Sequence, residues 1–239
     1  MQQWQSVVLN KTTRQALSNS TIHIWLAYFS DWQGQKPALL ENLSEEERRR
    51  AGRFRKEALA TRYILGRGLL RVLLATYTGI PAPQIDIKTN AYSKPMLSKK
   101  LLTFNLAHND RLVMYAFAKQ HPVGIDVEAE SPIQQSEARR ILTDAEWAHW
   151  QTLSKADRQH AFFRTWVRKE AVLKALGVGL SIEPDTFSVA NASQLKQAVR
   201  VMGTTLTIVD LPLNAPLYGA VATNDMEATL CYFVAQSAG

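Results

Sequence analysis

The stretch Gly124-Ile125-Asp126-Val127-Glu128 combines the pattern of a buried β-strand with two acidic side chains. Alternate side chains of a strand point to opposite faces, so Ile125 and Val127 face the protein core together. Asp126 and Glu128 then share the opposite face. Carboxylate oxygens are the ligands that Mg²⁺ prefers, and this ion is usually held by one or two of them together with substrate phosphates. The stretch therefore predicts a strand with one apolar face and one face suited to a metal ion.

A second stretch, Trp166-Val167-Arg168-Lys169-Glu170-Ala171-Val172-Leu173-Lys174, has the pattern of a helix. Trp166, Glu170 and Lys174 recur every four residues and lie along one side of it. One interpretation is an ordinary exposed Glu–Lys pair, which stabilises a helix by only about 0.2 to 0.5 kcal/mol. The other is a further acidic metal ligand with an ammonium beside it, which suits a phosphoryl oxygen.

The composition is that of a soluble globular protein. The 239 residues are 46% hydrophobic and 21% charged, which allows one domain or two small ones around a real core. The single cysteine, Cys231, excludes an internal disulfide framework and a zinc site built from several cysteines. A net charge of +7 favours acidic partners, which could be nucleic acid, a phosphorylated cofactor or an acidic protein.

Nothing in the sequence indicates a membrane protein. Residues 1–5 lack the charged region and the apolar block of a signal peptide. No apolar stretch approaches the roughly 18 residues of a membrane-spanning helix. We therefore expect a cytoplasmic protein without a membrane partner.

The order of predicted elements occurs twice along the chain. The first copy has a strand (22–28), a capping box at Ser44 and Glu47, a helix (61–78) and strands at 85–88, 102–106 and 112–118. The second has a strand (123–128), the same capping spacing at Thr143 and Glu146, a helix (156–176) and strands at 187–190, 199–202, 205–211, 217–222 and 229–235.

From this repetition we infer an α+β fold of two similar halves, residues 1–120 and 121–239, related by a pseudo-two-fold axis. Each half is expected to be a small, mainly antiparallel sheet packed with a long helix. The alternative is that a strand-helix-helix-strand order is common and matches itself by chance. A cleft between two halves of one chain would make a monomer sufficient, so we expect a monomer.

At the two motifs the sequence resembles the 4'-phosphopantetheinyl transferases, in particular the larger surfactin-synthetase-activating type with two similar halves in one chain. The signature of that family is a G-I/V-D-x-E strand followed by a W-x-x-K-E-A/S-x-x-K helix, and both parts are present here. Further agreement is spread over most of the chain, at Arg53-Phe54, Arg62-Tyr63-Ile64-Leu65-Gly66-Arg67, Lys94-Pro95, Phe104-Asn105-Leu106-Ala107-His108, Gly179-Leu180-Ser181 and Phe187-Ser188-Val189.

The resemblance implies an enzyme with holo-acyl-carrier-protein synthase activity. It would transfer the 4'-phosphopantetheine group from coenzyme A to a serine of an apo acyl, peptidyl or aryl carrier protein, with Mg²⁺, and release adenosine 3',5'-bisphosphate. Two charged phosphates must be held against a hydroxyl, so positioning and electrostatic stabilisation should supply most of the catalysis. Carrier proteins of this kind are acidic around the serine, which the charge of +7 suits.

The resemblance assigns the metal to the second half. Asp126, Glu128 and Glu170 are the implied Mg²⁺ ligands, although the first two could be solvated acids at a strand end. Water often replaces one carboxylate in a magnesium site, so a direct bond from Glu128 stays open. Glu170 is also the implied base toward the serine hydroxyl, either directly or through a metal-bound water.

Three basic or aromatic residues near these acids also match the family. Lys174 is implied to neutralise the leaving phosphate and to donate a proton to it. Lys169 points about 100° away from Glu170 around the helix, so it either touches a phosphate from the side or braces the helix. Trp166 either packs in the core or shapes the site.

The first half is implied to contribute the coenzyme A site. His108 matches a family histidine that contacts the phosphates, whereas Ala107 stands where many relatives carry a serine. Arg62 matches the residue that binds the 3'-phosphate, because a guanidinium suits a phosphate dianion. Arg50 falls where relatives place another phosphate contact, with a solvated helix face as the alternative. Lys94-Pro95 resembles the segment that lies along the adenine.

Two other functions remain possible on sequence grounds. One is a carrier-binding protein without catalysis, which the joint presence of the acidic residues and Lys174 argues against. The other is nucleic-acid binding through the basic cluster at residues 48–56. This cluster lacks a reader motif and a series of stacking aromatics, so we expect no nucleic-acid partner. The carrier itself is not identified, because carriers share the same serine chemistry and differ in surface contacts.

Overall fold

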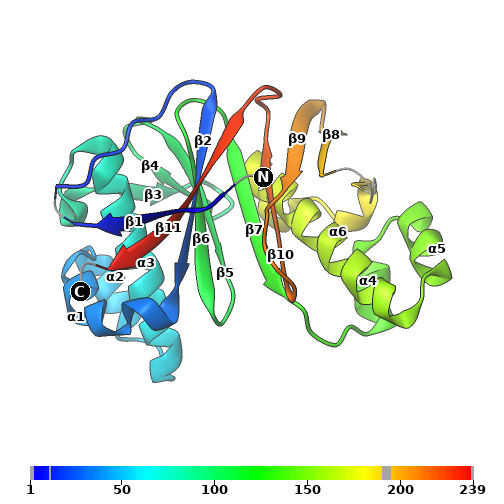
Figure 1. Cartoon of the computed structure of the whole chain (residues 1–239), viewed down its shortest axis with the longest axis horizontal. Helices are drawn as coiled ribbons and strands as arrows, with labels where there is room; N and C mark the ends of the chain where they lie inside the picture. The colour runs from blue at the N-terminus through cyan, green and yellow to red at the C-terminus, as the bar shows by residue number, and fades with distance from the viewer. Residues whose placement is uncertain (1–2, 11, 190–194, 238–239) are drawn as a thin grey trace.

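The computed structural model describes residues 3–10, 12–189 and 195–237, which form four layers (Figure 1). Across the molecule these are a helical layer, a five-stranded sheet, a four-stranded sheet and a second helical layer. The two sheets pack their apolar faces on each other in the middle. The fold is therefore α+β, as predicted. Within these ranges no helix has both the length and the apolar character needed to cross a membrane.

The first half is a five-stranded sheet covered by a long helix. Its strands are, in order across the sheet, β1 (Gln5–Leu9), β11 (Thr229–Ser237), β2 (Thr21–Tyr28), β6 (Leu112–Ala118) and β5 (Thr103–His108). The helix α3 (Glu57–Thr78) covers the outer face, where its Leu65 and Leu69 pack in one core with Trp25. Smaller elements complete this half: η1 (Phe29–Gln35), α1 (Lys36–Glu41), α2 (Glu45–Ala51), η2 (Ala82–Gln84), β3 (Ile87–Thr89) and β4 (Pro95–Leu97).

The second half repeats this arrangement with a fully antiparallel sheet. Its strands are, in order, β7 (Val123–Ala129), β10 (Leu217–Thr223), β9 (Thr204–Asp210) and β8 (Lys196–Val201). The long helix α6 (Lys155–Leu176) covers its outer face, with α4 (Gln135–Ile141), α5 (Asp144–Thr152), η3 (Gly179–Ser181) and η4 (Pro184–Thr186) around it. Both long helices contain 22 residues and end at a glycine in the left-handed conformation, Gly79 or Gly177.

The two predicted capping boxes are formed at the starts of α2 and α5. In both boxes the glutamate is buried and pairs with a cation of the long helix. Arg71 Nε lies 2.5 Å from Glu47 Oε2, and Lys169 Nζ lies 2.6 Å from Glu146 Oε2. The same interaction thus ties a short helix to the long helix in each half, which supports the predicted similarity of the halves.

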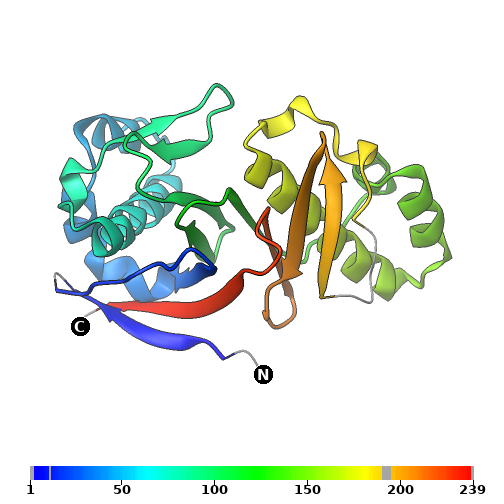
Figure 2. The same cartoon turned by 90° about the horizontal axis from the view of Figure 1, so that it is seen from above.

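The C-terminal strand does not stay in the half predicted for it. β11 pairs in parallel with β1 on one side and with β2 on the other, so residues 229–237 belong to the first sheet. Figure 2 shows β11, in red, beside the blue β1 along one side of the first half. Assigning all of 121–239 to the second half is therefore wrong for its last strand, because Phe233 and Ala235 fill the core beneath α3. The boundary near residue 120 stays a prediction.

The strand predicted at 187–190 is not formed over residues 187–189, and Ala190 lies outside the described residues. The backbone here bonds to buried side chains instead. The Val189 N–H donates to Glu146 Oε1 at 2.8 Å, and the Val189 carbonyl accepts from Arg168 Nη1 at 3.3 Å. Because these charged groups satisfy the backbone, the segment needs no neighbouring strand.

The two motifs meet where α6 lies directly on β7. A Cβ atom built on Gly124 would lie 2.1 Å from the carbonyl oxygen of Ala171 and 2.2 Å from the amide nitrogen of Ala175. Only glycine leaves room for the helix backbone at this point. The contact brings the acidic face of β7 against the side of α6 that carries Glu170.

Gly124→Ala should lower the free energy of unfolding by about 3 kcal/mol or more, because overpacking typically costs about 1 to 3 kcal/mol and both contacted atoms belong to the backbone. Urea denaturation followed by circular dichroism measures this loss. Gly34→Ala is the matched control, since its Cβ would meet no atom within 4 Å. A Gly124→Ala protein as stable as the Gly34→Ala protein would show that α6 does not rest on β7 here.

Candidate active site

Asp126 is the buried centre of the acidic face of β7. Its side chain is only 5% exposed, and its Oδ1 accepts a hydrogen bond from Lys174 Nζ at 2.6 Å. Burial raises the pKa of Asp126, while the Lys174 ammonium opposes that rise. In the part of the chain that the structure describes, Asp126 Oδ2 has no hydrogen-bond partner. A buried carboxylate oxygen without a partner is costly, so this atom is suited to a cation or a donor brought by a ligand.

Two further carboxylates lie within electrostatic reach of Asp126. Burial, together with the charges of Asp126 and Glu170, raises the pKa of Glu128 to about 6, although a hydrogen bond with the Trp166 side chain and the Lys174 ammonium oppose the shift. Burial also raises the pKa of Glu170, with a second contribution from Asp126. Mutual repulsion between the three carboxylates is the condition that a bound divalent cation relieves.

The carboxylates are not gathered at the distances of a finished metal site. Among residues 3–10, 12–189 and 195–237, no group of three or more His, Cys, Asp and Glu side chains is arranged to hold a metal ion. The donor set still fits Mg²⁺, since it offers oxygens alone and includes the unpartnered Asp126 Oδ2. The predicted ligands Asp126, Glu128 and Glu170 are thus neighbours, and their joint coordination of Mg²⁺ stays a prediction.

The first half brings positive charge toward these acids. His108 lies at the exposed end of β5, and its pKa is lowered by desolvation and then by the charges of Lys174 and Arg62. Arg62 projects from α3 and forms an ion pair with Asp110. The charges of Lys174 from the second half and of Arg62 from the first half thus both act on His108.

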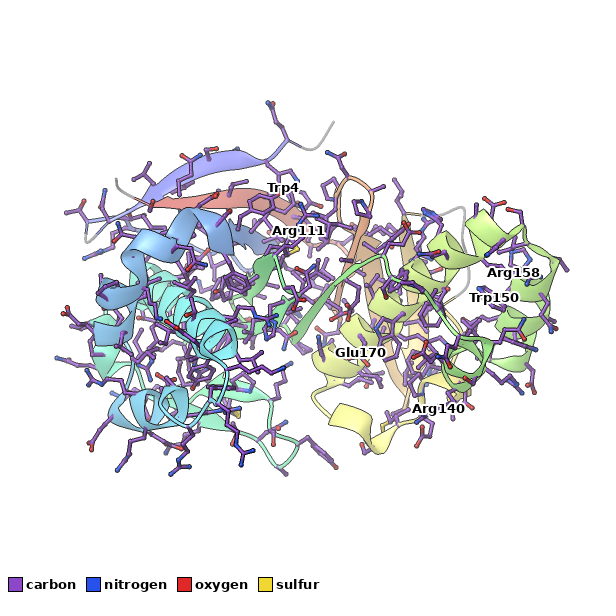
Figure 3. All side chains as sticks on the ribbon, turned by 90° about the horizontal axis from the view of Figure 1, so that it is seen from below. Trp4, Arg111, Arg140, Trp150, Arg158 and Glu170 are labelled. Atoms are coloured by element: carbon purple, nitrogen blue, oxygen red, sulfur yellow. The ribbon has the colours of Figure 1, made fainter. Side chains whose placement is uncertain are left out.

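A cavity of about 250 Å³ opens between the two halves. The first half lines it with Lys94, Pro95 and Asn105, and the second half lines it with Glu170 and Lys174. Figure 3 labels Glu170 on the part of α6 that is nearest the first half. The cavity thus joins Glu170 and Lys174 of the helix motif to the Lys94-Pro95 segment.

Asn105 fixes the two halves to each other beside this cavity. Its Oδ1 accepts a hydrogen bond from the Ile125 N–H at 2.9 Å, which links β5 to β7 next to Asp126. The Asn105 side chain thus accepts from a backbone N–H of β7 in place of the carbonyl of a neighbouring strand. Asn105 belongs to the family pattern, but no local pattern signals this role, because the bond depends on how the two sheets meet.

Comparison with known proteins decides the family. A model described as the 4'-phosphopantetheinyl transferase superfamily matches residues 122–211, and one described as the N-terminal part of 4'-phosphopantetheinyl transferase matches residues 25–120. The 4'-phosphopantetheinyl transferase HetI of Nostoc sp. is 32% identical over 179 residues, which cover 72% of this chain and 76% of HetI. The chain belongs to the 4'-phosphopantetheinyl transferase family.

A second relative agrees with this assignment. The 4'-phosphopantetheinyl transferase Sfp of Bacillus subtilis is 31% identical over 158 residues, which cover 66% of this chain and 70% of Sfp. The chain is therefore an enzyme, a 4'-phosphopantetheinyl transferase that modifies carrier proteins. The predicted family and enzyme class are confirmed.

Arg50 and Lys94 of this transferase are predicted to contact coenzyme A, and each has other contacts in the structure. Arg50 is exposed on α2, and its guanidinium carbon lies 5.3 Å from the centre of the Tyr63 ring. Tyr63 directly follows Arg62 in the sequence. Lys94 lines the cavity with its stem but directs its ammonium at backbone carbonyls, including that of Lys174 at 2.5 Å. Their predicted contacts with coenzyme A stay predictions.

Lys169 of the transferase is a brace. It is fully buried, and its Nζ lies 2.6 Å from Glu146 Oε2 and 2.8 Å from the carbonyls of Ile141 and Pro184. Of the two interpretations of Lys169, the structure selects the one in which it holds the helix. Arg168 does the same on the other side of α6, through bonds of 2.7 and 2.8 Å to the Asp210 carboxylate.

The two long helices differ at the positions that correspond to Glu170 and Lys174. Counted back from the glycines that end α3 and α6, Val72 and Thr76 occupy the positions of Glu170 and Lys174. Val72 and Thr76 line a separate cavity of about 540 Å³ in the first half. Because Val72 and Thr76 have neither a carboxylate nor an ammonium, this position of α3 cannot form a second site like the one at Glu170 and Lys174.

The raised pKa of Glu128 predicts how pH affects stability in metal-free protein. The folded pKa of about 6 lies above the ordinary value of 4.5, so the stabilising contribution is present at low pH and is lost as pH rises through about 6. Glu128→Gln cannot ionise. Its free energy of unfolding, relative to wild type, should therefore rise by about 1 kcal/mol between roughly pH 4.5 and 7.5.

Urea denaturation in EDTA at several pH values measures this difference. A difference between the two proteins that stays flat across this range would mean that Glu128 is not destabilised by burial and by the neighbouring acids.

Proposed function

We propose that this transferase moves 4'-phosphopantetheine from coenzyme A to a serine of an apo carrier protein in a Mg²⁺-dependent reaction that releases adenosine 3',5'-bisphosphate. The serine oxygen bonds to the phosphorus that carries pantetheine, and the bond to the other phosphate of the diphosphate breaks. The observation that carries the proposal is the buried Asp126 carboxylate, which has one oxygen without a partner among the described residues. Its other oxygen pairs with Lys174, which lines the cavity between the halves together with Glu170.

In this proposal Asp126, Glu128 and Glu170 hold Mg²⁺, which when bound would neutralise charge on the diphosphate. Glu170 accepts the serine proton, and its raised pKa makes the carboxylate a better base than an exposed glutamate. The Lys174 side chain is 29% exposed and lines the cavity, so its ammonium can donate to the leaving phosphate.

The first half binds coenzyme A in this proposal. His108 and Arg62 hold phosphates, a role supported by the charges of Arg62 and Lys174 that both act on His108. Arg50 adds a phosphate contact from α2, and Lys94-Pro95 lies along the adenine. His108 also serves the chemistry by holding the diphosphate close to Lys174.

The partners proposed are acidic carrier proteins or carrier domains, which the net charge of +7 would attract. A monomeric state, a cytoplasmic location and the lack of nucleic-acid and membrane partners stay predictions. The basic cluster at 48–56 leaves one competing function, nucleic-acid binding, which would give a salt-dependent affinity for DNA without any need for coenzyme A.

Mass spectrometry of apo carrier proteins tests the reaction directly. After incubation with the enzyme, coenzyme A and Mg²⁺, at least one carrier should gain about 340 Da, the mass of one phosphopantetheine group, on its serine. Omission of Mg²⁺ should prevent the gain. If acyl, peptidyl and aryl carriers all keep their mass while the enzyme is folded, the proposed reaction is wrong.

Asp126→Asn tests the metal site with a measurement that does not depend on turnover. A ligand that binds only the folded state raises the melting temperature, so millimolar Mg²⁺ should stabilise wild type. Asp126→Asn should lose this shift and should transfer at least about 100-fold more slowly. Glu227→Gln, an exposed acid far along the chain, should behave as wild type. An unchanged Mg²⁺ response in Asp126→Asn would remove Asp126 from the metal site.

A further inference from the structure

The β3–β4 hairpin of the first half reaches the C-terminal end of α6 in the second half. The last four carbonyl groups of an α-helix have no partner within the helix. Lys94 Nζ lies 2.5 Å from the Lys174 carbonyl oxygen and 3.4 Å from that of Ala175. Asn90 Nδ2 donates to the Gly177 carbonyl at 2.8 Å. Two side chains of one half thus satisfy the end of the helix that carries the acid and the lysine of the site.

The Lys94 ammonium also holds the strand on which this helix rests. Its Nζ lies 3.1 Å from the carbonyl oxygen of Val123, the first residue of β7. A cation at a helix C-terminus is stabilised by the partial negative charge there. Burial lowers the pKa of Lys94 to about 8, which leaves the side chain mainly protonated at neutral pH. One charged group therefore joins β7, α6 and the hairpin.

The hairpin is built to present these two donors. Asn90 Oδ1 accepts hydrogen bonds from the backbone N–H groups of Tyr92 and Lys94, both at 2.9 Å. The Asn90 N–H in turn donates to the Lys94 carbonyl at 2.9 Å. A Cβ on Gly177 would lie 3.2 Å from Lys94 Cδ and 3.3 Å from Asn90 Nδ2, so the helix end fits closely against both side chains. These bonds within residues 90–94 hold the shape of the turn without any contribution from the helix.

We propose that Asn90 and Lys94 are positioning residues that cap α6 across the two halves and thereby hold Glu170 and Lys174 in place against Asp126. The proposal rests on the proposed function, because it assigns these residues to the same reaction. Lys174 links the cap to the site, because its carbonyl accepts a hydrogen bond from Lys94 while its ammonium donates one to Asp126. A shift of about 1 Å at a reacting group can cost about 100-fold in rate.

This role differs in a measurable way from direct binding of coenzyme A. The Lys94 ammonium is directed at three backbone carbonyls, so its removal should disturb the helix rather than the affinity for the substrate. Lys94→Met keeps the apolar stem and removes the charge. Its kcat should fall by about 10- to 100-fold, while the KM for coenzyme A stays within about 3-fold of wild type.

Lys100→Met is the matched control, because Lys100 is an exposed lysine that lines the neighbouring cavity with Lys94. It should keep the wild-type kcat and KM. A raised KM for coenzyme A with an unchanged kcat in Lys94→Met would show that the Lys94 ammonium binds coenzyme A rather than the helix end, and would overturn the proposal. Unchanged values of both constants in Lys94→Met would also overturn it.

Hydrogen exchange tests the cap independently of turnover. The amides at the end of α6, such as the Gly177 N–H that donates to Leu173 O at 2.9 Å, should exchange about 10-fold faster in Lys94→Met and in Asn90→Ala than in Lys100→Met. Asn90→Ala decides the question if Lys94→Met does not fold. If wild type proves unable to transfer phosphopantetheine, the proposed function fails. Unchanged exchange at this helix end would overturn the cap whether or not the enzyme transfers phosphopantetheine.

Discussion

The close approach of α6 to β7 at Gly124 is the constraint on which the site depends. At this point backbone meets backbone, because Gly124 has no side chain to separate the helix from the strand. The acids of β7 alternate with its apolar residues, so they face the helix while Ile125 and Val127 face the other sheet. With the helix this close, Lys174 can reach Asp126 across the contact. A larger residue at position 124 would separate the two motifs that hold the predicted catalytic residues.

Buried charges in this protein fall into two kinds. The first kind is fully paired and holds the helices: Glu146 bonds to Lys169, Ser188 and the Val189 backbone, and removal of one partner from such a pair typically costs about 3 to 5 kcal/mol. The second kind is left incomplete, as at Asp126, where one oxygen is paired and the other has no hydrogen-bond partner among the described residues. Because an unpartnered oxygen on a buried carboxylate is costly, Asp126 is suited to bind a cation or a hydrogen-bond donor.

Local patterns in the sequence predicted the elements well because those patterns act over a few residues. The boxes at Ser44 and Thr143 fixed where two helices begin, and Gly79 and Gly177 fixed where the long ones end. The insertion of β11 between β1 and β2 could not be predicted, since the choice of sheet depends on which core has room for its apolar residues. The segment 187–189 lacks a strand for a similar reason, because distant charged side chains take its backbone bonds.

Local patterns also predicted part of the candidate site. Alternation along β7 and the four-residue spacing on α6 placed the acids and Lys174 on facing surfaces, which the ion pair between Asp126 and Lys174 bears out. The contacts of Lys169 and Lys94 depend on partners far away in sequence, so spacing could not separate a brace from a contact with coenzyme A.

The central claim is that Asp126 and Glu170 share one divalent cation with the diphosphate of coenzyme A. A crystal structure with coenzyme A and Mn²⁺, which takes the same oxygen ligands as Mg²⁺ and scatters anomalously, tests it most directly. The account predicts one anomalous peak bonded to Asp126, Glu170 and diphosphate oxygens, with Lys174 turned toward a phosphate. A structure with coenzyme A bound, no peak at these carboxylates and Lys174 still paired with Asp126 would contradict it.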